Sequence, residues 1–368
     1  MNDERVYDLI ILGAGFAGLS LADAALARGK KCLVLEKHMI GSGASGAPGI
    51  LANPASGRRA RITWKAEECF HHLLPFIRRI EKCSGLTLSG ELGTIRPALT
   101  SKIANDFKNS PKKYNWPAGW LHWINPDQAK EIYPFLGEQF GVLRVERSLS
   151  VRGDLFCSTA AEYLQGNGTE IVTASGHDIE QIETGWKLTF DGTAAITPHL
   201  VDCTGWSQVH SPYWSYIPLH AVKGQAATFR FPFVLPFKES ISSLGYMAKL
   251  PGLENELTVG STYEHHFENL EPDRSGLDYL KQKLDNTLPG YSDQISSVRE
   301  WASCRVSLPD KMPVIGRHKE LKGLYIFGGL GSKGFLQSRY LGELLADRIF
   351  SKKSMDPSIS SDRFLLTS

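Results

Sequence analysis

The sequence lacks the features that mark disulfide-bonded, metal-binding and membrane-spanning chains. Its six cysteines are scattered, without a C-x-x-C pair or a spacing typical of metal ligands, so we expect reduced thiols and no metal site. No apolar run approaches the ~20 residues that a membrane-spanning helix needs. The N-terminus has neither the basic flank nor the cleavage site of a signal peptide. We therefore expect a cytoplasmic protein that does not contact membranes.

The chain also lacks an excess of charge of either sign. Its 41 basic and 39 acidic side chains leave a net charge of +2, so any affinity for nucleic acid has to come from a local basic patch. Hydrophobic residues make up 42% and charged residues 22%, as in ordinary globular proteins. A length of 368 residues exceeds what one core usually supports, which predicts two domains. The oligomeric state is left open.

What the sequence does contain is a complete β–α–β opening. An apolar run over 6–12, typical of a buried strand, leads into G-A-G-F-A-G at 13–18 and a helical pattern over 19–28. In such a motif the glycines allow the tight turn, the approach of a pyrophosphate and close helix–strand packing. A second strand over 31–35 ends at Glu36, whose carboxylate can accept hydrogen bonds from a ribose. The segment predicts dinucleotide binding, to FAD or to NAD.

Two further glycine-rich runs favour FAD. Residues 41–46 read G-S-G-A-S-G and offer backbone amides and hydroxyls without bulky side chains; a flexible surface linker is the alternative. Residues 328–334 read G-G-L-G-S-K-G and again lie between a predicted strand and a predicted helix. The glycine-rich junctions at 13–18 and 328–334 lie at opposite ends of the chain. Together they fit one long dinucleotide, with its pyrophosphate at the first junction and its flavin end at the second.

Between these ends, three segments are typical of antiparallel strands, over 221–231, 245–250 and 257–262. The polar tail after Ser351 is expected to be loosely ordered. We predict an α/β fold with a discontinuous, Rossmann-like FAD-binding domain and an α+β substrate-binding domain on a mostly antiparallel sheet. The expected bounds are 1–82, 148–215 and 316–368 for the first domain, and 83–147 and 216–315 for the second.

Eight sequence blocks carry a family resemblance that covers nearly the whole chain. They are GAGFAGLSLA, EKHMIGSGASGAPGIL, VDCTGW, IPLHAVKGQ, LGYMAK, VGSTY, CRVSLPDKMPVIGRH and LYIFGGLGSKGF. In order and spacing they resemble the D-amino-acid oxidase (DAO) family of FAD-dependent oxidoreductases. Within that family the sequence is similar to the glycine oxidases and to the C-terminal FAD domain of the tRNA-modifying enzyme MnmC. The resemblance implies the GR2/DAO-type fold and non-covalently bound FAD.

The resemblance also implies which residues bind the cofactor. The pyrophosphate turn and ribose acceptor correspond to Gly13, Gly15, Phe16, Ala17, Gly18, Glu36 and Lys37. The loop beside the isoalloxazine corresponds to Ser42, Ser45 and Gly46, and the residue near the adenine to Ile179. Thr204 and Gly205 match the turn that closes over the cofactor. The turn whose amides face the flavin ring and stabilise its reduced form corresponds to Gly329, Gly331, Ser332, Lys333 and Gly334.

On the substrate side, the resemblance places four residues at the catalytic site. Arg305 matches an arginine that holds the substrate carboxylate, a role that suits its forked guanidinium. Tyr246 and Tyr263 match aromatic residues near the substrate, and Lys333 lies in the flavin-facing turn. The implied reaction is hydride transfer to flavin N5 from the carbon beside an amine nitrogen, followed by hydrolysis. The protein would supply orientation and a dry pocket rather than a general base.

The substrate has three interpretations. The blocks IPLHAVKGQ, VGSTYEHH and GGLGSKGF favour the carboxymethylaminomethyl group of a tRNA wobble uridine. The alternatives are free glycine, sarcosine or another small amino acid, and, in another class, a flavin-binding protein without turnover. Basic residues interleaved with tryptophans could hold tRNA; the alternative is an ordinary basic loop and packed tryptophans. These residues are Arg58, Arg59, Arg61, Lys65, Lys112, Lys113, Trp116, Trp120 and Trp123.

Three departures from the family pattern qualify this interpretation. MnmC has a methyltransferase domain before its FAD domain, whereas Met1 lies twelve residues before Gly13, so a tRNA substrate would be met alone or with a separate partner. Thr258 stands where the sarcosine oxidase branch has a lysine that activates oxygen. Cys304 lies near a cysteine that holds flavin covalently in that branch but is one position out of register, so we expect a buried structural thiol.

Overall fold

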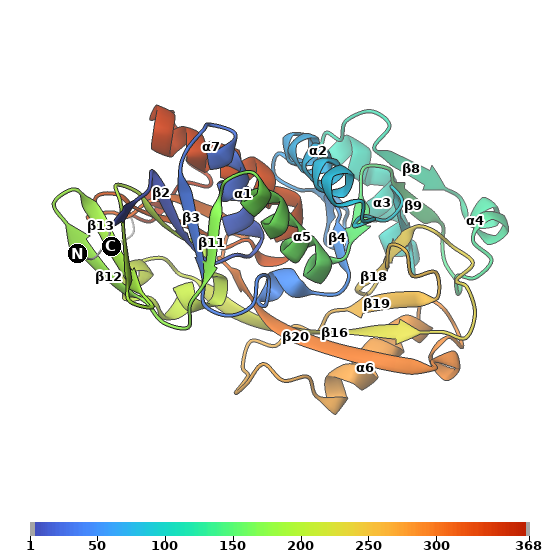
Figure 1. Cartoon of the computed structure of the whole chain (residues 1–368). Helices are drawn as coiled ribbons and strands as arrows, with labels where there is room; N and C mark the ends of the chain where they lie inside the picture. Colours follow the sequence, from blue (N-terminus) through green and yellow to red (C-terminus); the bar gives the residue numbers. More distant parts are fainter. Residues whose placement is uncertain (1–3, 366–368) are drawn as a thin grey trace.

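The computed structural model describes residues 4–365 and has the predicted α/β fold. One layer is a six-stranded sheet with the order β11-β3-β2-β15-β22-β21 (Figure 1). Its first five strands are parallel, and β21 pairs antiparallel with β22. The bounds are Glu170–Thr173 (β11), Cys32–Glu36 (β3), Leu9–Leu12 (β2), Leu200–Asp202 (β15), Leu324–Gly328 (β22) and Val314–Arg317 (β21). Strands from both ends and the middle of the chain therefore meet in one sheet.

Helix α1 (Phe16–Leu26) is buried from Phe16 to Ala25, although it begins directly at the first glycine turn. It contacts α5 (Gly153–Gly166) and α7 (Gly334–Ser351), and α2 (Ala66–Ser84) contacts both of these helices. Because neighbours surround it, α1 needs no polar face, which explains why its sequence is small and apolar throughout.

A buried carboxylate joins three of these helices. Asp23 of α1 is 2% exposed and lies 2.6 Å from Arg79 of α2 and 2.7 Å from Arg339 of α7. A buried charge is tolerated when it is paired in this way. The Asp23 carboxylate therefore links α1 to both α2 and α7.

The second large layer is an eight-stranded sheet with the order β20-β16-β19-β18-β17-β7-β9-β8, in which every pairing except β17–β7 is antiparallel. Helix α6 (Arg274–Asp285) contacts β16 and β19. The bounds are Ser297–Ser307 (β20), His220–Arg230 (β16), Glu256–Gly260 (β19), Tyr246–Lys249 (β18), Ser240–Ser242 (β17), Thr94–Pro97 (β7), Val142–Val145 (β9) and Leu121–Ile124 (β8).

Smaller elements complete the chain. A four-stranded sheet consists of Arg5–Val6 (β1), Thr193–Thr197 (β14), Gly185–Phe190 (β13) and Asp178–Ile182 (β12). Two-stranded ladders pair Leu149–Val151 (β10) with Ile50–Ala52 (β4), and Ala55–Ser56 (β5) with Arg61–Ile62 (β6). The remaining α-helices are Ser101–Lys113 (α3) and Pro126–Ile132 (α4).

The C-terminal tail differs from the sequence-based expectation of a loosely ordered segment. Ile359 is fully buried, and Ser360 forms an isolated bridge with Ile315 beside β21. The seryl hydroxyl of Ser361 donates to the carbonyl of Arg317 at 2.8 Å. The prediction was wrong because the tail is polar on average, whereas its docking depends on one apolar side chain and backbone pairing.

Within residues 4–365, no helix has the length and apolar character that crossing a bilayer requires. Nor does this part of the chain bring three or more His, Cys, Asp or Glu side chains together in a way that could hold a metal ion.

Candidate active site

The first glycine turn is shaped by close backbone contacts that exclude side chains. A Cβ at Gly13, whose φ is +98°, would lie 2.7 Å from the carbonyl oxygen of Cys203 in the neighbouring strand connection. A Cβ at Gly18 would lie 1.9 Å from the carbonyl oxygen of Gly13. The turn therefore brings the N-terminus of α1 against the ends of β2 and β15 with bare backbone. A helix N-terminus exposed in this way is suited to bind a pyrophosphate.

The second glycine-rich run lies against the same helix N-terminus. Ser45, in a short 3-10 helix (η1, Ala44–Gly46), accepts a hydrogen bond from the amide of Phe16 through its hydroxyl at 3.0 Å. A Cβ at Gly15 would lie 2.9 Å from that hydroxyl oxygen. Ser42 is exposed beside it. The tertiary structure thus joins the two runs that the sequence analysis considered separately.

The carboxylate of Glu36 is oriented by two backbone amides at the end of β3. One oxygen accepts from Ala14 at 2.7 Å and the other from His38 at 2.9 Å. The neighbouring Lys37 is exposed. Held at the turn by these amides, the acidic group lies beside the first glycine turn, as a ribose acceptor must. Ile179 lies half-buried on β12, opposite Leu188, outside the six-stranded sheet.

The turn after β15 is organised by a buried acid that sequence reasoning did not single out. Asp202 is 7% exposed and accepts hydrogen bonds from the amide of Thr204 at 2.9 Å and its hydroxyl at 2.7 Å. Its other oxygen accepts from the indole of Trp214 at 2.7 Å. Gly205 follows with φ +60°. The signal that could have revealed Asp202 was its place as the last residue of a buried strand.

The third glycine-rich run connects β22 to α7. Gly329 and Gly331 both have positive φ, and a Cβ at Gly329 would lie 2.7 Å from the side chain of Leu308. A 3-10 turn (η5, Gly331–Lys333), with Ser332 exposed, precedes Gly334, where α7 begins. Burial lowers the pKa of Lys333, and the nearby charge of Arg61 lowers it further. The free amides of the α7 N-terminus therefore lie at this junction.

The described residues fit an FAD molecule. Two strand-to-helix junctions offer bare backbone and helix N-termini, and a glutamate is oriented beside the first of them. Strand β20 contacts both η1 and η5, so it lies along both glycine-rich runs on the substrate side. Arg305 is on this strand, two residues before Ser307, whose Cβ would be 3.6 Å from a Cβ at Gly331.

Arg305, Tyr246 and Tyr263 come together where β18 begins and β19 and β20 end. The guanidinium of Arg305 donates to the carbonyl oxygen of Thr262 at 3.0 Å and lies 4.5 Å from the ring centre of Tyr263. Within residues 4–365, no carboxylate forms an ion pair with Arg305. Its charge is therefore held in place but not neutralised.

Tyr246 and Tyr263 differ in exposure. A Cβ at Gly260 would lie 2.4 Å from the ring of Tyr246, so that ring packs directly on the backbone of β19. Burial raises the pKa of Tyr246 to about 12, although Arg305 acts against this rise. Tyr263 is 63% exposed, with one ring face covered by Arg305. Tyr246 is thus partly buried and protonated at neutral pH, and Tyr263 is accessible.

Sequence reasoning missed a lysine at this place. Lys283 of α6 is 3% exposed, donates to the carbonyl oxygen of Ser261 at 2.7 Å and lies 4.4 Å from the ring centre of Tyr279. Burial lowers its pKa to about 8, with a further contribution from Arg305. No local pattern distinguishes Lys283 from other helix lysines, because only the packing of α6 on the sheet brings it to Ser261.

Two of the three departures from the family pattern, at Thr258 and Cys304, have structural counterparts. The hydroxyl of Thr258 is buried and bonded to that of Thr228 at 2.8 Å, and a Cβ at Gly49 would lie 2.7 Å from Thr258. Thr258 therefore faces the segment after η1 without a free polar group. Cys304 is 4% exposed and burial raises the pKa of its thiol, as expected of a structural cysteine.

The expected RNA-contacting residues divide into two groups. Trp120 is buried against Phe70, and the indole of Trp116 donates to Ser110 at 3.0 Å. Trp120 therefore packs in the core, as the packing alternative expects, whereas Trp116 is only partly buried. The basic residues, in contrast, stay outside; Arg58, Arg59, Arg61, Lys112 and Lys113 are all exposed.

Known proteins resemble this chain over most of its length. The profile of the DAO family, described as FAD dependent oxidoreductase, matches residues 8–348. The bifunctional tRNA 5-methylaminomethyl-2-thiouridine biosynthesis protein MnmC of Thiobacillus denitrificans is 28% identical over 356 residues, covering 92% of this chain and 56% of that protein. The chain thus spans about half the length of this relative. The glycine oxidase of Geobacillus kaustophilus is 22% identical over 356 residues, covering 95% of this chain and 94% of that enzyme.

Solved structures share the fold at low identity. The glycine oxidase of Geobacillus kaustophilus superposes with a TM-score of 0.83 at 21% identity, covering 96% of this chain and 97% of that one. The iminodiacetate oxidase of Chelativorans sp. BNC1 has a TM-score of 0.78 at 18% identity, covering 96% and 99%. With the family profile matching most of the chain, this protein belongs to the DAO family of FAD-dependent oxidoreductases.

Proposed function

We propose that this enzyme oxidises a glycine-like amine and that its substrate is the carboxymethylaminomethyl group of a wobble uridine in tRNA. The C–N bond to the carboxymethyl unit is oxidised by two electrons and then hydrolysed by water, so that this unit leaves as glyoxylate and the amine stays on the uridine. FAD, when bound, supplies the acceptor for the two electrons. The residues described above then have the tasks of binding, orienting and enclosing the substrate.

The observation that carries the choice of a carboxylate-bearing amine is the state of Arg305. Its guanidinium is oriented by a neutral carbonyl, that of Thr262, and meets no carboxylate among residues 4–365. An arginine with its positive charge still available is suited to bind a substrate carboxylate through two parallel hydrogen bonds. Tyr246 keeps its proton at neutral pH because its pKa is about 12, so it can donate a hydrogen bond but cannot serve as a base.

Two observations support tRNA as the carrier of this amine. The first is the likeness to MnmC, whose name states a role in tRNA modification, over 92% of this chain. The second is the turn between β5 and β6, where Arg58 and Arg59 are exposed and which leads to Arg61. Since the charge of Arg61 acts on Lys333, this basic hairpin lies near the flavin-facing turn. A phosphate backbone bound there would bring a nucleotide to the site.

Anaerobic bleaching of the flavin absorbance tests the proposal. The purified, FAD-loaded protein is mixed with tRNA that carries the carboxymethylaminomethyl group, with the same tRNA lacking it, with glycine or with sarcosine. We expect bleaching by the modified tRNA and glyoxylate as its product. Bleaching by glycine or sarcosine alone would contradict the tRNA assignment and make the enzyme a small-amino-acid oxidoreductase, the alternative that the full-length match to glycine oxidase supports.

A further inference from the structure

The block IPLHAVKGQ contains three consecutive residues of β16, Lys223, Gly224 and Gln225, that all act on the surroundings of Arg305. Arg305 lies opposite Val222 in the β16–β20 ladder. A Cβ at Gly224 would lie 2.3 Å from a guanidinium nitrogen of Arg305, so the absence of a side chain lets the arginine lie across this strand. The two neighbours of Gly224 contact the segment that holds Arg305.

Lys223 is 4% exposed and forms an ion pair with Glu264 at 3.5 Å, and a longer one with Asp273 at 3.9 Å. The backbones of Lys223 and Glu264 also exchange two hydrogen bonds of 3.0 Å each. Gln225 fixes the far end of the same loop, because its side-chain amide accepts from the Asp273 amide and donates to the Asp273 carbonyl, both at 3.0 Å. Both ends of the 264–273 loop are therefore attached to β16.

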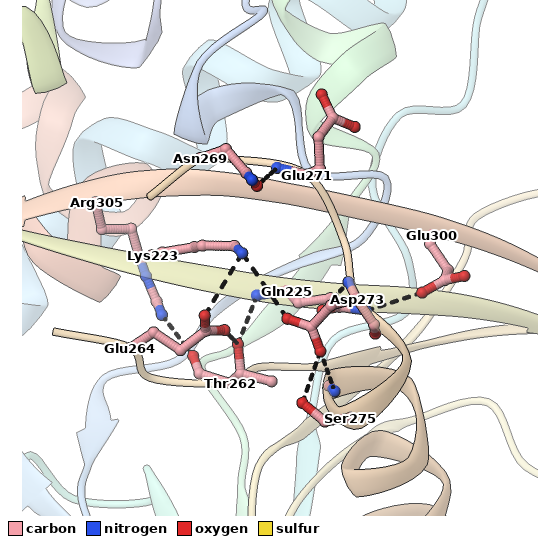
Figure 2. Close-up of polar contacts among 11 residues, drawn as sticks. Lys223, Gln225, Thr262, Glu264, Asn269, Glu271, Asp273, Ser275, Glu300 and Arg305 are labelled. Carbon is pink, nitrogen blue, oxygen red and sulfur yellow. Dashed lines mark hydrogen bonds and ion pairs between the residues drawn. The ribbon is translucent and has the colours of Figure 1, made fainter. Parts of the chain in front are cut away.

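Figure 2 shows the carboxylate of Glu264 between Lys223 and Thr262. One Glu264 oxygen accepts from the Thr262 hydroxyl at 2.9 Å, and that hydroxyl accepts from the backbone amide of Gln225 at 2.9 Å. The carbonyl of the same Thr262 holds Arg305. Glu264 thus contacts the hydroxyl of Thr262 and Arg305 contacts its carbonyl, yet Glu264 and Arg305 form no ion pair with each other.

This arrangement solves an electrostatic problem. A glutamate so near an unpaired arginine would bind it by a charge-assisted hydrogen bond and would then compete with the substrate carboxylate. The buried ammonium of Lys223 attracts Glu264 to the other side, and the Thr262 hydroxyl occupies a second site on its carboxylate. The Lys223 ammonium is buried while Glu264 is 28% exposed, so water screens this pairing less than it screens a pair at the surface.

We propose that Lys223 is a positioning residue for substrate binding, which keeps the carboxylate of Glu264 away from Arg305 and so leaves Arg305 free for the substrate carboxylate. The inference rests on the proposed role of Arg305. Without Lys223, Glu264 loses its partner and rotates toward the guanidinium. The Glu264 carboxylate then competes with the substrate carboxylate for Arg305.

Acetate tests this in the FAD-loaded enzyme, because it has the carboxylate but no amine to be oxidised. Its dissociation constant is measured through the perturbation of the flavin spectrum. We expect Lys223→Met to weaken acetate binding about tenfold or more, which corresponds to ~1.4 kcal/mol. Adding Glu264→Gln to that variant should restore binding to within about threefold of wild type. Loss of fold or of a contact cannot produce such rescue, whereas removal of a competing charge does.

The matched control is Lys249→Met. Lys249 is a lysine of the same sheet with 7% exposure, which pairs with Glu254 at 3.4 Å but has no contact with Thr262 or Arg305. The Lys249→Met substitution should leave acetate binding unchanged. If Lys223→Met does not fold with FAD, Lys223→Gln replaces it in the same pair of measurements.

Two results would overturn the inference. One is acetate binding by the Lys223 variant as tight as in wild type, and the other is a double variant as weak as the single one. The proposed function has a separate outcome. If the wild-type holoenzyme itself binds neither acetate nor any amine, then the role of Arg305 fails, and not the action of Lys223 upon it.

Discussion

Arg305 of β20 and Lys283 of α6 both contact the segment 261–262. The carbonyl of Thr262 holds Arg305, and the carbonyl of Ser261 holds Lys283. A carbonyl orients a cation by a hydrogen bond without cancelling its charge. Burial of such a charge costs stability, which is acceptable where the charge is used for binding. Both residues therefore lead to predictions about charge rather than about packing.

Replacing Arg305 by alanine should weaken the binding of acetate about 100-fold, ~3 kcal/mol, because a charge-assisted pair is lost. The FAD content should not change, since Arg305 contacts the substrate side of the site. The flavin absorbance of the purified variant and its acetate titration give both values. Arg299→Ala is the matched control; Arg299 is on the same strand, is itself exposed, and pairs with the buried Glu256, which keeps Arg230 as a second partner. Equal loss of flavin and acetate would contradict the role of Arg305.

Lys283 should make stability depend on pH. Its pKa is about 8 in the folded chain against a usual 10.5, and the neighbouring titratable groups are Arg305, Tyr279 and Tyr246. Between these two pKa values the unfolded chain binds more protons, so the free energy of unfolding rises with pH. From about pH 7.5 to about pH 9.5 this group contributes a gain of ~2 kcal/mol.

Urea unfolding of wild type and Lys283→Met over this range checks that expectation. The free energy of unfolding should rise with pH in wild type but not in the variant, whatever the stability of the variant at pH 7. The range ends before Tyr246 matters, because its raised pKa makes stability fall above about pH 10. Parallel pH profiles for the two proteins would show that Lys283 does not titrate as described.

Among the elements, the junctions between strands and helices hold the residues proposed to bind the cofactor. At each one a parallel strand ends, the chain turns on glycine, and a helix begins with free amides. The turns are tight because neighbouring strand connections occupy the space where side chains would lie. The fit of the cofactor therefore depends on backbone approach, which a single methyl group disturbs.

Gly13→Ala should abolish FAD binding, with less than about a tenth of the flavin retained, because the added Cβ meets the Cys203 carbonyl at 2.7 Å. Gly29→Ala is the control. It also has a positive φ of +65° but nothing lies within 4 Å of its Cβ. It should lose about 1 kcal/mol of stability and keep its FAD. Flavin content and thermal unfolding separate the two effects, and full FAD binding by Gly13→Ala would refute the proposed turn.

For the molecule as a whole, the distribution of charge matters more than its sum. The net charge of +2 gives no general attraction to RNA, yet Arg58 and Arg59 are exposed on the hairpin that leads to Arg61 and Lys333. The cofactor turns follow the C-terminal ends of the parallel strands. Lys319 and Lys322 precede β22 and therefore lie at the opposite, N-terminal end of the parallel strands.

Reversing both hairpin charges, with Arg58→Glu and Arg59→Glu, should weaken tRNA binding at least about tenfold at low salt and leave acetate binding unchanged. The pair Lys319→Glu and Lys322→Glu changes the net charge equally at the opposite end of the strands and should have little effect. Filter binding or fluorescence anisotropy at several salt concentrations measures the difference. Equal loss in both pairs would show that RNA responds to total charge and not to the hairpin.

Prediction from sequence succeeded where neighbours in the chain are also neighbours in space. The strand, glycine turn and helix at residues 9–26 follow from a local pattern, and so does the place of Glu36 at a strand end. The start of α1 was predicted at Leu19 but lies at Phe16, because the turn residues themselves enter the helix. Arg305 and Tyr263 came from a family resemblance, and the structure brings them together.

The sequence by itself determined the class of the protein, because buried strands, glycine turns and a final acidic residue are local consequences of residue type and spacing. The tertiary structure decided which charges are free. Lys223 is separated from Glu264 by about 40 residues, and Lys283 reaches Ser261 from another element, so no spacing rule connects them. Packing likewise buried Trp120 while leaving the hairpin arginines outside, since core formation takes aromatic surface from water and leaves charge in it.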